Sequence, residues 1–268
     1  MIKWFFETYL SDEFNAEGFI YNASTKNYTW LEMCRNIAIE IDSILKQYRL
    51  FCEEGVVNRE LFELSTEHML ISNVPTQIKD KYVYPVEENV AGIMHLLFSD
   101  QSLMLYQEGR ERYKNAYEVL RNHKVSYCDL KPYQRSDIDW LIEQKILWLD
   151  ECDQIAYSPK MLFVLYDIYK NEYMCLKYID SFADEIDFLI ENSLVRIGSS
   201  FLSIPEQNYY NYIFNNAEYD NSKDLRNRYA HGNQTLNEDE MKKDYLTMLR
   251  MMILIILKIN EEFCLLCD

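Results

Sequence analysis

The sequence predicts a mainly α-helical protein, with helical bundles and one small β-hairpin in the middle of the chain. Only 6 glycines and 5 prolines occur among 268 residues, and this scarcity disfavours turn-rich folds built from many β-strands. Hydrophobic residues make up 49% of the chain and aromatic residues 15%, which is enough for an ordered core. Long helices joined by short connections are therefore expected.

The first part of the chain is predicted to be helical. In residues 28–54 the apolar positions recur at helical spacing, and Gly55 follows as a stop signal. A second helical stretch is expected over residues 87–123, with breaks near Ser99 and Gly109. Neither stretch contains a chemical motif.

The middle of the chain changes character. Residues 136–144 predict a short helix capped by Ser136. Two β-prone runs, 146–149 and 154–157, then flank the acidic turn 150–153 and predict a hairpin. A helix followed by a hairpin resembles the second half of a winged helix. Because the turn has the wrong charge for gripping a phosphate backbone, a structural or protein-contact role is favoured over DNA reading.

The last third returns to helix. Residues 182–194 carry a helical apolar stripe, and a polar connection rich in Asn and Tyr is expected over 203–221. Asn237 is expected to cap a final helix, residues 238–266. That helix is apolar on nearly every side through residues 251–257, so we expect it to be buried in a bundle or at a subunit interface.

These changes of pattern divide the chain into three parts. Residues 1–131 form a helical N-terminal region, and residues 132–175 form a winged-helix-like helix plus hairpin. Residues 176–268 form a C-terminal helical bundle. No motif indicates what the first part does.

The charge of the chain limits its function. A net charge of −17 argues against a general nucleic-acid coat protein, because phosphate binding depends on clustered Lys and Arg. Residues 176–268 hold 9 basic and 16 acidic side chains, yet residues 223–231 hold 3 basic side chains and 1 acidic one. Such a local positive spot suits a site that touches one or two phosphates.

Cysteine usage and apolar runs favour a cytoplasmic protein. Seven cysteines, an odd number spread along the chain, do not form a disulfide pattern. The pair Cys264 and Cys267 lacks a second pair or a His cluster, so helix packing is favoured over a zinc site. The N-terminus lacks a signal-peptide core, and the apolar run 251–257 is too short to span a bilayer. No cofactor, metal or membrane partner is expected.

One segment, residues 224–232, brings together sparse cationic groups and one of the four histidines. Arg226 and His231 flank four residues, and Asn227 directly follows the arginine. Metal-free RNA cleavage needs a base for the ribose 2′-OH, an acid for the leaving oxygen and a cation for the phosphate. Histidine suits both proton roles near neutral pH, and arginine offers a planar fork of donors. The pattern therefore favours RNA cleavage.

This segment resembles the signature of the HEPN superfamily, in which Arg, a polar residue, a few further positions and His follow one another. The resemblance covers the C-terminal third, 176–268. It implies a helical bundle that dimerises, so that Arg and His of two subunits line one cleft, and a metal-independent endoribonuclease of the toxin or phage-defence type. Carried over by position, Arg226 would bind phosphate, Asn227 would assist orientation and His231 would be the general acid/base. Some HEPN toxins paired with nucleotidyltransferase antitoxins carry a tyrosine where this chain has Asn233.

Helix geometry indicates a second candidate for the cationic role. At about 100° per residue, Arg226 and His231 lie roughly 140° apart on a regular helix. They can share a site through arginine's reach, an irregular helix end or a partner subunit. Arg228, three residues before His231, lies on the same helical face as the histidine and is the second candidate for the cationic role.

Other interpretations stay open. Arg-Asn-Arg near a helix end also occurs on solvated faces, and His-Gly also closes helices, since Gly takes the left-handed C-cap conformation. The alternatives to a nuclease are a non-catalytic HEPN-like scaffold that binds a partner and a winged-helix regulator using residues 136–157. The expected partners are RNA through a local contact only, a second copy of the chain as a homodimer, and a regulatory protein.

Overall fold

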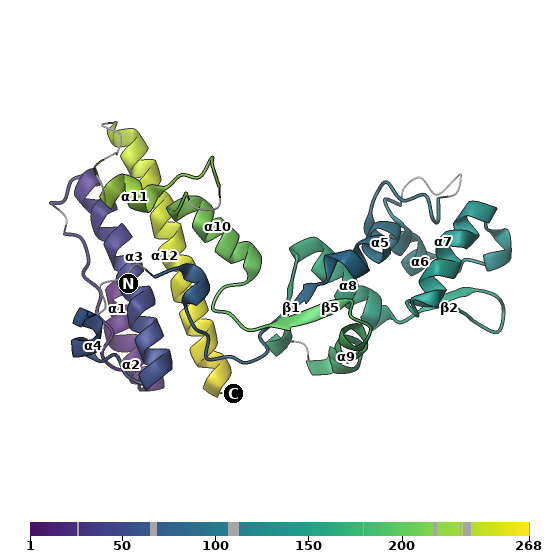
Figure 1. Ribbon diagram of the computed structural model, residues 1–268, viewed down its shortest axis with the longest axis horizontal. Helices are drawn as coiled ribbons and strands as arrows, with labels where there is room; N and C mark the ends of the chain where they lie inside the picture. Colours follow the sequence, from purple (N-terminus) through teal and green to yellow (C-terminus); the bar gives the residue numbers. More distant parts are fainter. Residues whose placement is uncertain are drawn as a thin grey trace. The chain divides into compact units, whose positions relative to one another are not determined.

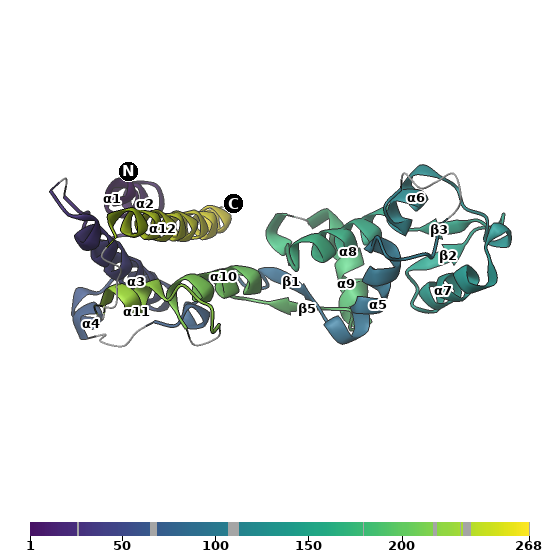
Figure 2. The same cartoon turned by 90° about the horizontal axis from the view of Figure 1, so that it is seen from above.

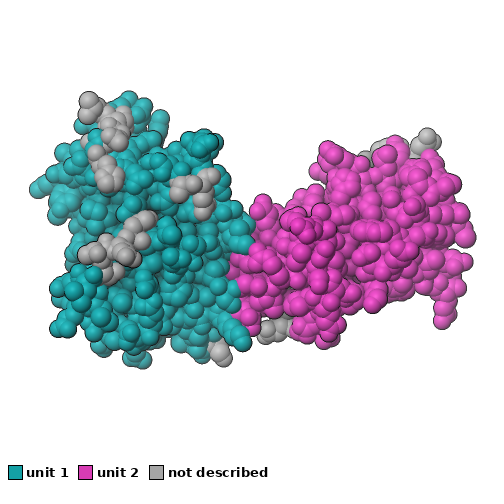
Figure 3. Space-filling model, viewed as in Figure 1, with its two compact units in different colours: residues 1–79, 199–268 teal, residues 80–198 magenta. Residues whose placement is uncertain are grey.

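The computed structural model describes residues 1–25, 27–64, 69–106, 113–178, 180–216, 219–230, 232 and 237–267. The fold is mainly α-helical with small antiparallel sheets, as the sequence predicts. The chain divides into two compact units, shown in Figure 3. Unit 1 consists of residues 1–79 and 199–268, and unit 2 consists of residues 80–198.

This division differs from the three consecutive parts expected from the sequence. The boundaries follow residues 79 and 198, whereas the expected ones followed residues 131 and 175. The reason is that helices from both ends of the chain share one core. A local sequence pattern does not report which distant helix covers an apolar face.

Unit 1 is a helical bundle (Figure 1). Its helical segments are α1 (Ile2–Trp4), the π-helix Phe5–Tyr9, α2 (Leu10–Phe14), α3 (Trp30–Glu54), α4 (Arg59–Leu64), the 3-10 turn Ile71–Asn73, α10 (Ile204–Phe214), α11 (Leu225–Ala230) and α12 (Glu238–Cys267). Thr29 and Glu32 form a capping box at the start of α3, and Gly55 ends it at φ 73°. The helix predicted over 28–54 is confirmed.

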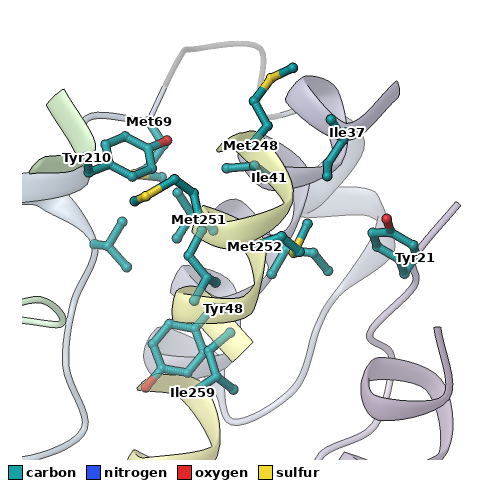
Figure 4. Packing of buried hydrophobic residues seen from close by; sticks show 14 of the residues in the cluster. Tyr21, Ile37, Ile41, Tyr48, Met69, Tyr210, Met248, Met251, Met252 and Ile259 are labelled. Carbon is teal, nitrogen blue, oxygen red and sulfur yellow. The ribbon is translucent and has the colours of Figure 1, made fainter. Parts of the chain in front are cut away.

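The core of unit 1 lies where α3 packs against α12. Figure 4 shows labelled residues of this core, which include Ile37, Ile41 and Tyr48 of α3 and Met248, Met251, Met252 and Ile259 of α12. The predicted final helix is confirmed, and Asn237 Oδ1 accepts the Asp239 N–H at 2.9 Å as its cap. Its burial is one-sided, because Ile253 is 42% exposed and Leu257 is 60% exposed.

A helix stands where a connection was expected. Residues 203–221 were predicted as a polar connection, and this was wrong over α10. Ser203 begins this helix with a capping box, in which the Glu206 carboxylate accepts the Ser203 N–H at 2.8 Å. Tyr210, Ile213 and Phe214 are buried in the unit 1 core. The many Asn and Tyr residues hide the helical stripe, because a tyrosine is apolar only when its ring finds a partner.

Unit 2 contains the remaining helices and the strands. The helices are α5 (Glu87–Phe98), α6 (Ala116–Asn122), α7 (Pro132–Glu143), α8 (Pro159–Asn171) and α9 (Ala183–Glu191), with 3-10 turns at Tyr127–Asp129, Leu176–Tyr178 and Asp180–Phe182. The strands are β1 (Tyr82–Pro85), β2 (Leu147–Leu149), β3 (Ile155–Tyr157), β4 (Met174–Cys175) and β5 (Val195–Gly198). The predicted hairpin is confirmed as β2 and β3, which lie beside α7 in Figure 2.

Helix α7 begins earlier than predicted. The expected cap at Ser136 is wrong, because Pro132 occupies the first turn and the Lys131 N–H donates to Gln134 Oε1 at 3.0 Å. Proline is well suited to that position, since its missing N–H would have no partner there. Ser136 instead lies on the exposed side of the helix.

Unit 2 contains an internal repeat. The sequence Ile-Asp-Trp-Leu-Ile-Glu at residues 138–143 returns 48 residues later as Ile-Asp-Phe-Leu-Ile-Glu at 186–191. Both helices end alike, since Ile146 N–H donates to the Leu141 carbonyl and Leu194 N–H donates to the Leu189 carbonyl. Lys145 and Ser193, also 48 residues apart, both have positive φ, at 59° and 55°.

Strands pair in a similar way around the two copies of this repeat. We call each copy, together with its strands, a module. In module A, residues 116–157, β3 pairs with β2 and the adjacent Gln154 bridges to Ser126. In module B, residues 159–198 together with β1, the sheet order is β4-β1-β5. Figure 1 and Figure 2 both show β1 and β5 side by side. The middle strand of module A, β3, therefore follows α7 in the sequence. The middle strand of module B, β1, instead precedes both copies of the repeat in the sequence.

Candidate nucleic-acid site on unit 1

Helix α11 carries the predicted arginines and is short. Leu225 and Tyr229, four residues apart, are buried and hold the helix against the bundle. Asp224 precedes the helix at φ 47°, and its carbonyl accepts the Arg228 N–H at 2.9 Å. At 3.6 residues per turn, Asn227 lies opposite the two buried residues, and Arg226 and Arg228 lie on either side of the buried face, where both are half-buried.

Asn227 and Arg226 are neighbours in space as well as in sequence. The Asn227 amide donates to Asp224 Oδ1 at 2.8 Å. Its oxygen is thereby oriented to accept from Arg226 Nη1, at the longer distance of 3.5 Å. The structure thus brings these two predicted residues together, through a long hydrogen bond.

Arg228 is engaged elsewhere. Its Nη1 lies 3.4 Å from Asp244 Oδ2, and the Tyr229 hydroxyl donates to the same oxygen at 2.9 Å. These contacts fasten α11 to α12. Burial first, and then the hydrogen bond to Asp244, raise the pKa of Tyr229, so this hydroxyl stays protonated at neutral pH. Arg228, the second candidate for the cationic role, therefore has a structural contact that Arg226 lacks.

A pocket of about 480 Å³ opens beside Arg226. It lies between α3 and α11 and is lined by Arg35, Ala38, Ile39, Asp42, Arg226, Tyr229 and Ala230. Its size falls within the range of small-ligand sites. The lining combines two guanidinium groups and one carboxylate with a mainly apolar surface, a composition suited to an anionic ligand that also has an apolar part and hydroxyl groups.

Two charged residues of the pocket lining, Asp42 and Arg226, act on other groups nearby. Asp42 forms an ion pair with Lys46 at 3.1 Å, one turn along α3. Burial raises the pKa of the nearby Tyr210, Asp42 raises it further, and Arg226 opposes the shift. Both charged groups therefore act on the same buried hydroxyl, which belongs to α10.

Sequence reasoning missed Arg35 and Asp42. Their spacing of seven residues places them on one face of α3, which the sequence could have indicated. Nothing in the local pattern indicates that this face meets α11, because the two helices are separated by about 190 positions along the chain.

His231 lies outside the described residues, and so does Asn233. The residue directly before the histidine, Ala230, lines the pocket. Gly232 has φ 81°, a left-handed conformation that favours glycine. The structure therefore places three of the four predicted site residues. Arg226 lines the pocket, Asn227 contacts Arg226, and Arg228 pairs with Asp244.

Within the described ranges, no group of three or more His, Cys, Asp or Glu side chains could hold a metal ion. Cys264 and Cys267 are both exposed and free. Among the helices of the part of the chain that is described, none is long and apolar enough to cross a membrane. Comparison with protein-family models, curated proteins and solved structures found no match to this chain.

Proposed function

We propose that unit 1 is a HEPN-like, metal-independent endoribonuclease of the toxin or phage-defence type. The observation that carries the proposal is the pocket between α3 and α11. Arg226 lines it, a second arginine faces it, and the residue next to His231 is part of its wall. This arrangement supports a phosphate bound beside a histidine. Arginine offers the phosphate a planar fork of donors, and it stays charged throughout the working pH range.

The reaction follows from these groups. A base removes the proton of a ribose 2′-OH, the 2′-oxygen bonds to phosphorus, and the bond from phosphorus to the 5′-oxygen breaks as an acid protonates that oxygen. The products are a 2′,3′-cyclic phosphate and a 5′-hydroxyl. His231 acts as the acid/base, Arg226 stabilises the crowded phosphate, and Asn227 orients the guanidinium.

A homodimer is part of the proposal. Leu246, Ile253 and Leu257 are exposed apolar residues of α12. Spacings of seven and four residues place them on one helical face. A second copy that covers this face would remove apolar side chains from water, and in the HEPN arrangement it would also complete the cleft.

The first test is RNA cleavage in EDTA by the wild type, His231→Ala and Arg226→Ala. Arg49→Gln is the matched control, because Arg49 lies on the same helix as Arg35 but pairs with Glu53 at 2.7 Å. We expect the wild type and the control to produce cyclic-phosphate ends, His231→Ala to be inactive, and Arg226→Ala to cleave with kcat/KM lowered about a hundredfold. Undiminished cleavage by His231→Ala would reject the assignment.

A second candidate is a non-catalytic HEPN-like scaffold that binds a regulatory protein, and the charge of unit 2 favours it. Residues 80–198 hold 13 basic and 21 acidic side chains. The exposed Asp139 and Glu143 of module A match the exposed Asp187 and Glu191 of module B. Such surfaces repel a phosphate backbone, so the same observation disfavours a winged-helix regulator that reads DNA. A tight protein complex without nuclease activity would support the scaffold.

A further inference from the structure

Arg35 differs in its charged neighbours from Arg49 and Arg228, two other arginines of the bundle. Arg49 pairs with Glu53, and Arg228 pairs with Asp244. Arg35 is exposed, lines the pocket and forms no ion pair with a described residue. Arg226 likewise forms no ion pair in the described ranges, and the acceptor of its hydrogen bond there is the neutral Asn227. Two guanidiniums that form no ion pair with a described residue therefore line one pocket, together with the single carboxylate of Asp42.

Like charges around one pocket cost free energy unless an anion offsets them. The carboxylate in the lining does not serve this purpose for Arg35, since Asp42 lies two helical turns away and pairs with Lys46 at 3.1 Å. The protein as a whole is strongly acidic, with 44 acidic and 27 basic side chains. Two arginines that line one pocket and form no ion pair with a described residue are, in such a protein, the pattern expected of an anion-binding site.

The volume of the pocket indicates a ligand larger than one phosphate. About 480 Å³ is the size of sites that hold whole small molecules. Between the charged residues, Ala38 and the 65% exposed Ile39 offer an apolar surface to a ribose or a base. A ribose hydroxyl in the pocket could also donate to the Asp42 carboxylate, which is an acceptor only.

We propose that Arg35 is a second phosphate-binding residue of this site and holds the phosphate next to the one bound by Arg226. This inference rests on the proposed function and deepens it. The substrate class is single-stranded RNA presenting at least two consecutive phosphates. Arg35 is a binding residue that positions the strand, whereas the bond-breaking step belongs to His231 and Arg226.

The cleavage experiment uses short DNA oligonucleotides that contain a single ribose, so that only one linkage can be cut. A neutral methylphosphonate replaces the neighbouring phosphate, on the 5′ side in one probe and on the 3′ side in another. For the wild type we expect one of the two replacements to lower kcat/KM about tenfold. Arg35→Gln should lower kcat/KM of the unmodified probe by the same factor and be insensitive to the replacement, because both changes remove one contact.

The binding experiment does not depend on cleavage. A fully 2′-O-methylated RNA of the same length cannot be cut, and its dissociation constant is measured as a function of salt. Arg35→Gln should weaken binding and make the slope of log K against log salt shallower by about 0.7, the value for one phosphate contact on a single strand. Arg35→Lys should recover the slope but only part of the affinity, since lysine lacks the planar fork. Arg49→Gln should match the wild type.

The outcomes separate the inference from the proposed function. Two results would overturn the inference without affecting the proposed nuclease. One is that Arg35→Gln leaves kcat/KM unchanged. The other is that the methylphosphonate lowers kcat/KM of Arg35→Gln by the same factor as it lowers that of the wild type. Binding that depends on Arg35 without cleavage by any variant would reject the nuclease and retain the phosphate site. No binding of the methylated RNA at low salt would overturn the inference. Arg35 is exposed, so its variants should fold normally, which a thermal melt checks.

Discussion

Units 1 and 2 are both acidic, but they place their exposed charges differently. On unit 1, Arg35 and Arg226 face a shared pocket without ion pairs in the described ranges. On unit 2, the repeated helices α7 and α9 expose acidic side chains at matched positions. The net charge of −17 averages over both arrangements. The comparison teaches that an acidic protein can still hold a phosphate site, because binding responds to the local field.

The two units also differ in how their cores are held together. In unit 1 the fully buried Glu262 carboxylate accepts from the Tyr48 hydroxyl, from Thr76 Oγ1 at 2.5 Å and from the Gln77 N–H at 2.9 Å. In unit 2 the repeated segments 138–143 and 186–191 bury apolar side chains, with Leu141 and Leu189 at equivalent positions. A polar network specifies its partners by geometry, whereas an apolar contact depends on shape and volume.

Breaking the polar network should have the largest effect. Glu262→Ala removes the acceptor of the buried Tyr48 hydroxyl and of the half-buried Gln77 N–H, and we expect unit 1 to lose about 4 kcal/mol of unfolding free energy. Chemical denaturation followed by fluorescence measures the change. The exposed Glu53→Ala is the control and should cost less than about 0.5 kcal/mol. Equal losses for both variants would contradict the role given to the buried carboxylate.

The repeat in unit 2 provides a matched pair of core substitutions. Leu141→Ala and Leu189→Ala each remove a fully buried side chain at equivalent positions, so each should cost about 3 kcal/mol. Hydrogen exchange of the unit 2 amides measures the loss. Protection of the unit 1 amides should change much less, and an equal fall in both units would show that they unfold together.

The arginines of α11 test the charge comparison at the site. Arg226→Ala should lower kcat/KM for RNA about a hundredfold, the effect of losing one donor to developing phosphate charge. Arg228→Gln should lower it less than about tenfold, because Arg228 is 38% exposed and its partner is Asp244. Steady-state cleavage assays compare the two. The reverse order would transfer the phosphate role to Arg228.

The smallest effect concerns the acidic pairs of unit 2. Glu143 and Glu191 each follow an aspartate by four residues and end their helices, so like-charge repulsion and the helix dipole both disfavour them. Glu143→Gln and Glu191→Gln should each stabilise unit 2 by about 0.5 kcal/mol. Glu53→Gln in unit 1 should have the opposite sign, since it removes the Arg49 ion pair. Thermal melts at low salt resolve the signs.

Local patterns predicted those elements whose signals lie within a few residues. Thr29 and Gly55 bound α3, Asn237 caps α12, and the acidic turn joins β2 to β3. The prediction of α10 was wrong because its apolar face consists largely of aromatic residues such as Tyr210 and Phe214, among many polar ones. Ser136 was a wrong cap because Pro132 starts α7 a turn earlier.

The residues of the candidate site also fall into those that the sequence indicates and those that only the structure shows. Arg226, Asn227 and Arg228 could be found from the sequence, since residue type and spacing are local properties. Arg35 and Asp42 could not, because they join the pocket only when α3 packs against α11. Which of the two arginines of α11 forms an ion pair also depends on packing. Asp244 comes from α12, and it meets Arg228 rather than Arg226.

The sequence by itself determined the helical fold class, the ends of α3 and α12, the hairpin and the arginine-to-histidine segment, because hydrophobic periodicity, capping and turn chemistry act over a few residues. Only the tertiary structure decided that both chain ends build one unit, that β1 completes module B from before both repeats, and that Arg35 faces Arg226. Burial of apolar surface drives these contacts and is non-directional, so the partners are selected by the shape of the whole core.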